Sequence, residues 1–587
     1  MKPSPKRVDP SHPRECPAVL LAIGLALFAT PFVPAQIKPQ PAPPANPLAA
    51  DPLNDNRTRL GHVLFFEEQV SSTRTVACAT CHLPRAGGTD PRPKVLHPGN
   101  FPSALDDALG SAGVIRNLEN GTYTSSAIFG LEPQGTRRKA PSVLTGAVFE
   151  TLFWDGRAGG VFEDESNPPV AVPGLTSGAA LESQAVGPPI SAVEMAHIGA
   201  TWAQVEARIA NATPLALASD IPERLVTYIG GRGYPELFDE AFAGSDVAPG
   251  PGVTRRRFAM AVAAYQRSLL PQQAPVISGN LGGPESLAAW GGFLFEGMPA
   301  AGRAGCSSCH KDVGRLSPEG PTVTHVRKTD NEFHHIGVTP PDLDPGRFAV
   351  TGDPADFGAF KTSSLFNVAL QDWFFHNGKY DTLEDVVDFY IRGGDFPNEA
   401  IVPLNLIDPS GQVNNTFGRA ALVAYLKRFT DPRLEVADPR DLLPPYDRPI
   451  LYTESEHVPT SFGTGTGSPQ VPIAIAIEPP RIGNPSFTIG LKNALGGTMA
   501  ELWLNDASTP GTVYSGVTVY LAETANLVKI PISVQGTGAG GGFASVSLPL
   551  SANPALIGTA AFAQWILVDP GGPAGLTASD AIEYVYF

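Results

Sequence analysis

The sequence predicts a mainly α-helical chain that ends in a C-terminal all-β, sandwich-like domain. Three observations predict this fold class. Two Cys-x-x-Cys-His motifs stand far apart, one starting at Cys78 and the other at Cys306, and the domain around each also contains a segment with helical spacing. Beyond residue 448, charged residues thin out, and short β-rich segments alternate with Gly and Pro. The 60 Pro and 61 Gly among 587 residues predict many loops around modest helices.

The two Cys-x-x-Cys-His motifs have the form that attaches c-type haem. The cysteines add to the haem vinyl groups as thioethers, and the histidine becomes the proximal iron ligand. A structural disulfide or half of a zinc site would not explain why His follows the second Cys both times. We therefore expect two covalently bound haem c groups in two cytochrome c-like haem domains with long loops. The expected haem residues are Cys78, Cys81, His82, Cys306, Cys309 and His310.

The first 35 residues have the pattern of a signal peptide. A basic start is followed by an apolar run over residues 18–28 and by Val33-Pro34-Ala35, which suits cleavage after Ala35. The run is shorter than the ~20 residues that span a bilayer, so we expect no integral membrane span in the mature chain. Cys16 would be removed with this segment, and each remaining cysteine belongs to a haem motif. The expected location is the periplasm or another exported compartment, with no disulfides.

Composition divides the rest of the chain. Residues 36–50 are a Pro/Ala-rich tether. The first haem domain is expected at residues 51–271. It contains a predicted helix over 255–270 whose apolar residues share one side. The second haem domain is expected at residues 284–446, with predicted helices over 287–295 and 420–429. A β-rich accessory domain follows at 459–587, with strands over 473–477, 486–491 and 517–521. A spacer or packing role is favoured for this domain over docking or glycan binding.

The net charge of −16 does not suggest a nucleic-acid partner. An acidic surface suits a basic redox partner, although charge sets the rate of association more than the identity of the partner.

Further strings occur in a fixed order around the haem motifs. The chain resembles the bacterial di-haem cytochrome c peroxidase and MauG family over residues 60–429. The strings that carry the resemblance are Leu60-Gly61, Leu64-Phe65-Phe66, Phe153-Trp154-Asp155-Gly156-Arg157-Ala158, Gly187-Pro188, Val193-Glu194-Met195, Asp344-Pro345-Gly346-Arg347, Leu365-Phe366-Asn367-Val368-Ala369-Leu370, Phe375-His376-Asn377-Gly378 and Thr382-Leu383-Glu384-Asp385.

The resemblance implies a peroxidatic haem in the first domain and an electron-transfer haem in the second. Glu194 and Gln184 match the polar residues of the family's peroxide pocket, and a carboxylate there can move a proton between the peroxide oxygens. Trp154 matches the tryptophan between the haems. Without the resemblance, Glu194 would be read as a solvated glutamate and Trp154 as a core residue.

The resemblance leaves open which ligand lies opposite His310. Peroxidases of the family use a methionine, and MauG uses a tyrosine. Tyr390 falls at the matching place on a helix that starts at Thr382, on the same face as Leu383 and Val387. Met298 is the weaker candidate. A phenolate stabilises ferric iron, whereas methionine raises the potential.

Two departures from the family pattern concern the first haem and calcium. The loop Gly110-Ser111-Ala112-Gly113-Val114 carries no histidine where reductively activated peroxidases have a distal one, and His97 lies outside the matching position. The first haem is then open to peroxide from the start. Lys139 replaces the asparagine of the family's inter-haem calcium site, near Gln371 and Trp373, so calcium is possible but doubtful.

Other histidines carry weaker expectations. His376 is expected to line the inter-haem region, and His334 and His335 are expected either to contact a haem propionate or to pack. The remaining ones, His62, His197, His325 and His457, are expected to be structural.

The sequence therefore predicts a di-haem c-type peroxidase that reduces hydrogen peroxide, with the MauG-like branch favoured by Tyr390. A small c-type cytochrome, a cupredoxin or an oxidised protein substrate would supply electrons. The alternatives are a conventional peroxidase that needs reductive activation, a non-catalytic di-haem electron-transfer or binding protein, and a haem-bearing adhesin organised by the β domain.

Overall fold

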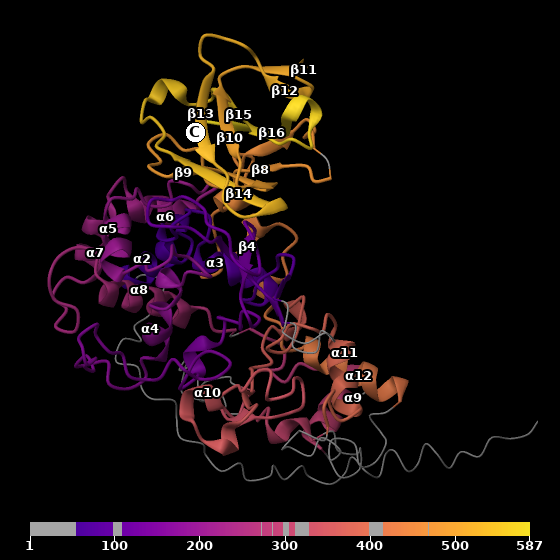
Figure 1. Ribbon diagram of the computed structural model, residues 1–587. Helices are drawn as coiled ribbons and strands as arrows, with labels where there is room; N and C mark the ends of the chain where they lie inside the picture. Colours follow the sequence, from indigo (N-terminus) through magenta and orange to yellow (C-terminus); the bar gives the residue numbers. More distant parts are fainter. Residues whose placement is uncertain are drawn as a thin grey trace, which may run out of the picture. The chain divides into compact units, whose positions relative to one another are not determined.

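The computed structural model describes residues 55–97, 108–271, 273–283, 286–297, 305–311, 328–397, 415–467 and 469–587, which fall within one compact unit (Figure 1). The predicted signal peptide and tether, Met298 and His325 lie outside the described residues.

Helices form the first part of the chain around one apolar core. They are α2 (Asn56–Phe65), α3 (Cys78–Cys81), α4 (Ala180–Ala185), α5 (Trp202–Ala210), α6 (Glu223–Ile229), α7 (Tyr234–Ala241) and α8 (Arg255–Ser268). The apolar side predicted for the helix over 255–270 is confirmed, because Phe258, Val262, Tyr265 and Leu269 are all buried in this core. Short hairpin strands lie between the helices: β1 (Val95–His97) pairs with β2 (Ala108–Gly110), and β3 (Ala112–Ile115) with β4 (Pro133–Gly135).

A second group of helices has its own core. It contains α9 (Leu287–Glu296), α11 (Leu383–Ile391) and α12 (Thr416–Lys427), with the short helix α10 (Phe348–Thr351) and the strands β5 (Phe333–His334) and β6 (Phe360–Lys361) nearby in sequence. Polar side chains cap the three longer helices: Ser286, Thr382 and Asn415 each accept a hydrogen bond from a first-turn amide. The helix predicted to start at Thr382 is confirmed.

The same close contact between two helices occurs in both helical groups. A glycine in the helix before each Cys-x-x-Cys-His motif lies against the backbone of the group's last helix. A Cβ on Gly61 would lie 1.8 Å from the carbonyl oxygen of Ala261, and a Cβ on Gly291 would lie 1.9 Å from that of Ala421. Only glycine allows these approaches between α2 and α8 and between α9 and α12, which lie side by side in Figure 1.

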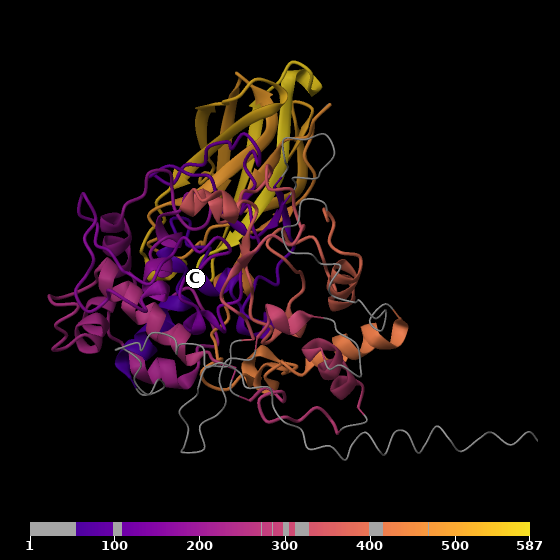
Figure 2. The ribbon, with the colours of Figure 1, turned by 90° about the horizontal axis from the view of Figure 1, so that it is seen from below.

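The C-terminal part is a β-sandwich. One sheet has the strand order β13-β10-β15-β16-β7 and the other the order β14-β9-β8, with β11 and β12 as a separate hairpin. Side chains from both sheets share a core around Trp565, whose indole Nε1 donates to the carbonyl oxygen of Gly490 at 2.9 Å. Figure 2 shows these long strands from below. The strands are β7 (Thr460–Phe462), β8 (Ile473–Ile475), β9 (Phe487–Gly496), β10 (Met499–Asn505), β11 (Ser508–Tyr514), β12 (Val517–Leu521), β13 (Val528–Ser533), β14 (Gly538–Leu548), β15 (Ala560–Val568) and β16 (Leu576–Val585).

The chain returns to the first core after the second helical group. Leu434, Leu442, Tyr446 and Leu451 are buried in the core that α2 and α8 build, and the Tyr446 hydroxyl donates to the carbonyl oxygen of Leu269 at 3.1 Å. The sequence assigned residues up to 446 to the second domain. That assignment fails after Phe429, because composition does not reveal which core a short apolar segment joins.

Candidate haem site and its surroundings

A single cavity of about 1130 Å³ contains both Cys-x-x-Cys-His motifs on its walls. This exceeds the roughly 300–1,000 Å³ of a usual small-molecule pocket. Its lining includes all ten residues proposed from the sequence for haem attachment, iron ligation or catalysis, namely Cys78, Cys81, His82, Trp154, Gln184, Glu194, Cys306, Cys309, His310 and Tyr390.

The first motif begins on the single-turn helix α3. The Thr80 hydroxyl accepts a hydrogen bond from the Ala77 amide at 2.9 Å, which fixes the start of the turn. His82 Nδ1 lies 3.2 Å from the carbonyl oxygen of Gly88. Because a carbonyl can only accept, this contact places the proton on Nδ1 and leaves Nε2 as the basic nitrogen. Burial lowers the pKa of His82, so the imidazole is held in the neutral form that binds metal.

The second motif repeats this arrangement. His310 Nδ1 lies 3.2 Å from the carbonyl oxygen of Lys328, and burial lowers the pKa of His310 to about 4. Both histidines therefore present a neutral imidazole whose orientation is set by a backbone carbonyl. Two such residues in one cavity match the proximal ligands that the motifs predict.

Glu194 lies in a tight turn that three other segments hold. Ser72 donates its amide to the Met195 carbonyl at 2.8 Å, and the Gln134 side chain donates to the Ala192 carbonyl at 2.6 Å. Val114 of β3 donates its amide to the Val193 carbonyl at 3.2 Å. Burial raises the pKa of Glu194, against the opposing effects of the Ser191 hydroxyl and Arg157. A carboxyl group near the first motif with a raised pKa can both give and take a proton.

Trp154 and His376 form an aromatic contact inside the cavity. The Trp154 indole donates to the Lys139 carbonyl at 2.8 Å, and its ring centroid lies 6.3 Å from that of His376 in an edge-on arrangement. His376 stacks on Phe360 with centroids 3.5 Å apart, and its buried Nε2 has no hydrogen-bond partner among the residues that the structure describes. Gln184, on α4, lines the same cavity.

Tyr390 lies on α11 and faces the second motif. It lines the cavity together with Val386 and Val387 from the same helix, while Leu383 packs in the second core. Burial raises the pKa of the Tyr390 phenol, with Cys306 as the next cause. The inward direction predicted from the helical spacing is confirmed; ligation to iron stays a prediction.

Lys139 occupies the place where the family's calcium site was expected. Its side chain is 2% exposed, and Nζ donates to the Gln371 amide oxygen. Burial lowers the pKa of Lys139 to about 7. A lysine ammonium at this place repels a divalent cation.

Arg138 forms ion pairs that link the part of the chain around the first motif to the part around the second, and the sequence did not predict them. Arg138 pairs with Asp155 of the first half at 2.7 Å and with Asp344 of the second at 2.6 Å. Arg347 donates to the Asp155 carbonyl at 2.9 Å. Both aspartates belong to sequence strings that carry the family resemblance. No local spacing, however, indicates that one arginine pairs with both of them.

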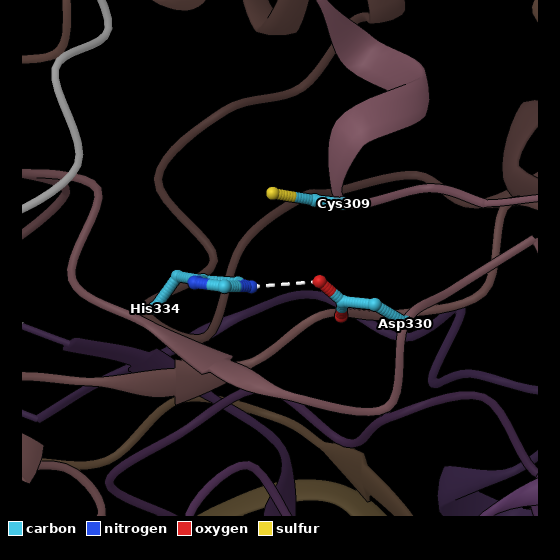
Figure 3. Close-up of side chains that lie close together, drawn as sticks. All are labelled: Cys309, Asp330 and His334. Carbon is cyan, nitrogen blue, oxygen red and sulfur yellow. Dashed lines mark hydrogen bonds and ion pairs between the residues drawn. The ribbon is translucent and has the colours of Figure 1, made fainter.

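Cys309, Asp330 and His334 lie close together beside the second motif, with their ligand atoms within 4.8 Å of one another. Figure 3 shows His334 Nε2 directed at the Asp330 carboxylate, a distance of 2.8 Å, with the Cys309 sulfur near both. Such a trio could hold a metal ion. Cys309 is, however, a predicted haem-attachment residue, so the cluster belongs to the second haem motif.

Comparison with known proteins places the chain in a family. A family model described as di-haem cytochrome c peroxidase matches residues 55–276. The methylamine utilization protein MauG of Methylorubrum extorquens is 30% identical over 351 residues, which cover 59% of this chain and 71% of MauG. The chain belongs to the di-haem cytochrome c peroxidase and MauG family. As a member it is an oxidoreductase of the di-haem peroxidase type, so the resemblance stated from the sequence is confirmed.

Two further proteins are similar to the chain. Cytochrome c551 peroxidase of Pseudomonas aeruginosa is 26% identical over 379 residues, covering 63% of this chain and 84% of the relative. The solved structure of a MauG-like protein associated with microbial copper homeostasis aligns with a TM-score of 0.44 at 23% identity, covering 71% of this chain and 99% of that one. In the described part of the chain, no helix is both long and apolar enough to cross a bilayer.

Proposed function

We propose that this family member reduces hydrogen peroxide at a haem held by Cys78, Cys81 and His82. Cys306, Cys309 and His310 would hold a second haem, with Tyr390 as its proposed further ligand, and this group would supply electron exchange with the first site. The observation that carries the proposal is the common cavity, because both motifs and the acid–base candidate Glu194 line it.

The residues present fit two c-type haems. Each proximal histidine is oriented by a backbone carbonyl, and each motif has its two cysteines at the cavity wall. Haem iron, when bound, supplies the redox chemistry that splits the O–O bond.

Glu194 moves the proton. In its ionised form the carboxylate takes a proton from one peroxide oxygen, and in its neutral form it returns that proton to the oxygen that leaves as water. Burial raises the pKa of Glu194, which favours its neutral form more than in an ordinary glutamate. Gln184 on α4 provides a second polar group on the same cavity wall.

Trp154 provides a route between the two halves. Its indole is fixed by the Lys139 carbonyl, and its ring contacts His376. The Arg138 bridge to Asp155 and Asp344 keeps the halves at a set separation. Electron exchange through aromatic side chains depends steeply on such fixed distances.

Tyr390 favours the MauG-like branch over a conventional peroxidase. A phenolate ligand stabilises ferric iron and lowers the potential of the second haem. A small c-type cytochrome or cupredoxin would then be a poor electron donor, and the favoured electron source is a protein side chain that becomes oxidised as it gives up electrons. Hydrogen peroxide is the small substrate, and the predicted signal peptide supports the periplasm as the site of the reaction.

The test is the reaction of the haem-loaded ferric protein with hydrogen peroxide, followed by stopped-flow absorbance in wild type and in Glu194→Gln. We expect the variant to react about 10²- to 10⁴-fold more slowly, the usual contribution of acid–base catalysis. Glu223→Gln, which changes an exposed carboxylate on α6, is the matched control and should react like wild type. Equal rates in all three proteins would remove Glu194 from the mechanism.

A further inference from the structure

The β-sandwich contacts the haem region at the wall that lies against Glu194. We call residues 112–135, which comprise β3, β4 and the loop between them, the wall hairpin. Its residues Ala112, Gly113 and Gln134 line the cavity. Through Val114 and Gln134 it donates two of the hydrogen bonds that hold the Glu194 turn.

The wall hairpin is poorly held by its own strands. β3 and β4 pair at Ala112 with Gly135 and at Ile115 with Pro133, with a register shift between the two pairs, and the loop adds a bridge between Asn117 and Tyr123. A short two-stranded hairpin is marginal in water without further packing. Its position must therefore come from other parts of the fold.

Side chains of the β-sandwich form hydrogen bonds with the backbone at the tip of the wall hairpin. The Ser545 hydroxyl accepts from the Tyr123 amide at 2.9 Å and lies 3.1 Å from the Tyr123 carbonyl, to which it donates. The Thr488 hydroxyl lies 3.0 Å from the carbonyl oxygen of Gly121. Ser545 and Thr488 stand on the paired strands β14 and β9.

A buried hydrogen bond and an apolar cluster also hold the wall hairpin against the β-sandwich. The Tyr123 hydroxyl donates to Glu478 Oε1 at 3.0 Å, with both residues at most 2% exposed. Arg74, four residues before Cys78, faces Glu478 and donates to the Ser486 hydroxyl at 2.7 Å. The apolar side chains that meet across this contact are Ile115, Tyr123, Leu131, Ile475, Ile477 and Phe543.

We propose that the β-sandwich holds the wall hairpin in place through Tyr123, and that Tyr123 is thereby a positioning residue for Glu194. This inference rests on the proposed role of Glu194. It makes the β-sandwich a working part of the peroxidase and not a spacer. The path runs from Glu478 and Ser545 through Tyr123 and β3 to the Val193 carbonyl, next to Glu194.

The test combines hydrogen exchange with peroxide kinetics on the full, haem-loaded protein. In Tyr123→Phe, Glu478 loses its buried donor, and a buried hydrogen bond of this kind changes local opening by about tenfold. We expect amides in residues 112–135 and 191–198 to exchange about tenfold faster and the reaction with peroxide to slow by a similar factor. Peptides from α9 and α12 should exchange as in wild type, which shows that the fold is intact.

Four further variants separate positioning from general destabilisation. Glu478→Leu removes the acceptor and should reproduce Tyr123→Phe. Glu478→Gln keeps an acceptor for the Tyr123 hydroxyl and should restore wild-type exchange and reactivity. Tyr520→Phe removes a tyrosine hydroxyl that bonds Thr464 inside the sandwich, and should leave the hairpin unchanged. Ser545→Ala should behave as Tyr123→Phe and serves if the latter does not fold.

The inference is overturned if Tyr123→Phe speeds exchange at the hairpin tip but leaves residues 191–198 and peroxide reactivity as in wild type. It is equally overturned if Tyr520→Phe has the same effects as Tyr123→Phe. If wild-type protein does not react with peroxide while exchange at 191–198 still depends on Tyr123, the proposed function fails and the coupling stands.

Discussion

Four ionisable side chains on the cavity wall are each shifted by burial toward the neutral form. Burial raises the pKa of Glu194 and lowers those of His82, His310 and Lys139. In a cavity of low polarity, an uncompensated charge is costly. Neutral imidazoles are free to bind iron, and a neutral carboxyl is able to donate a proton.

Tyr390 controls the potential of the second haem in our proposal. Replacing a hard phenolate ligand by a thioether should raise that potential. Tyr390→Met is therefore expected to shift the second reduction step to a more positive value in a potentiometric titration. Tyr380→Phe is the matched control, because Tyr380 bonds Asp395 and Arg392 instead of lining the cavity. A potential that does not move in Tyr390→Met contradicts ligation by Tyr390.

Lys139 predicts a pH dependence of stability. Its pKa falls from an ordinary value of 10.5 to about 7 on folding. Between these values the unfolded chain binds the proton and the folded chain does not, so the free energy of unfolding rises with pH, by roughly 1 kcal/mol per pH unit. Lys139→Met should lose this rise in thermal unfolding measured at pH 7.5 and 9.5. Lys427→Met, at an exposed site on α12, should keep it; equal slopes in all three proteins contradict the expectation.

The sequence predicted which single residues line the common cavity, whereas their roles stay predictions. The haem motifs, Glu194 and Tyr390 stand in local strings, and helical spacing was enough to place Tyr390 on the inner face of α11. The bridge from Arg138 to Asp155 and Asp344 was not predictable, because it joins residues that are far apart in the chain.

At the scale of elements, glycines set how closely segments approach. Gly61 and Gly291 allow the two helix crossings, and Gly113 allows β3 to lie against the Glu194 turn. A Cβ on Gly113 would lie 1.9 Å from the Val193 carbonyl oxygen and 2.9 Å from Glu194 Cα.

Gly113→Ala should therefore move β3 away from Glu194. A displacement of about 1 Å in a reacting group costs on the order of 100-fold in rate. We expect peroxide reactivity to fall by that order while haem content stays normal, measured by stopped-flow absorbance and by the haem absorbance per protein. Gly159→Ala, where a Cβ would meet nothing within 4 Å, is the control. Wild-type reactivity in Gly113→Ala would show that this approach does not position Glu194.

At the scale of the whole molecule, two helical groups share one cavity, and the β-sandwich packs against the wall hairpin that lines it. Composition predicted the change from helices to strands, because periodicity and charge differ between the two parts. It did not predict that residues 434–451 return to the first core, or that the loop around Tyr123 packs against the paired strands β9 and β14. Both depend on contacts between distant segments, which leave no local pattern.

The most direct test of the account is to add one equivalent of hydrogen peroxide to the ferric, haem-loaded protein without prior reduction and to record optical and electron paramagnetic resonance spectra. The account predicts that the ferric signals are lost rapidly, because the loop over residues 110–114 supplies no histidine to block the first haem. An entirely low-spin ferric spectrum that does not change until an electron is supplied would contradict it.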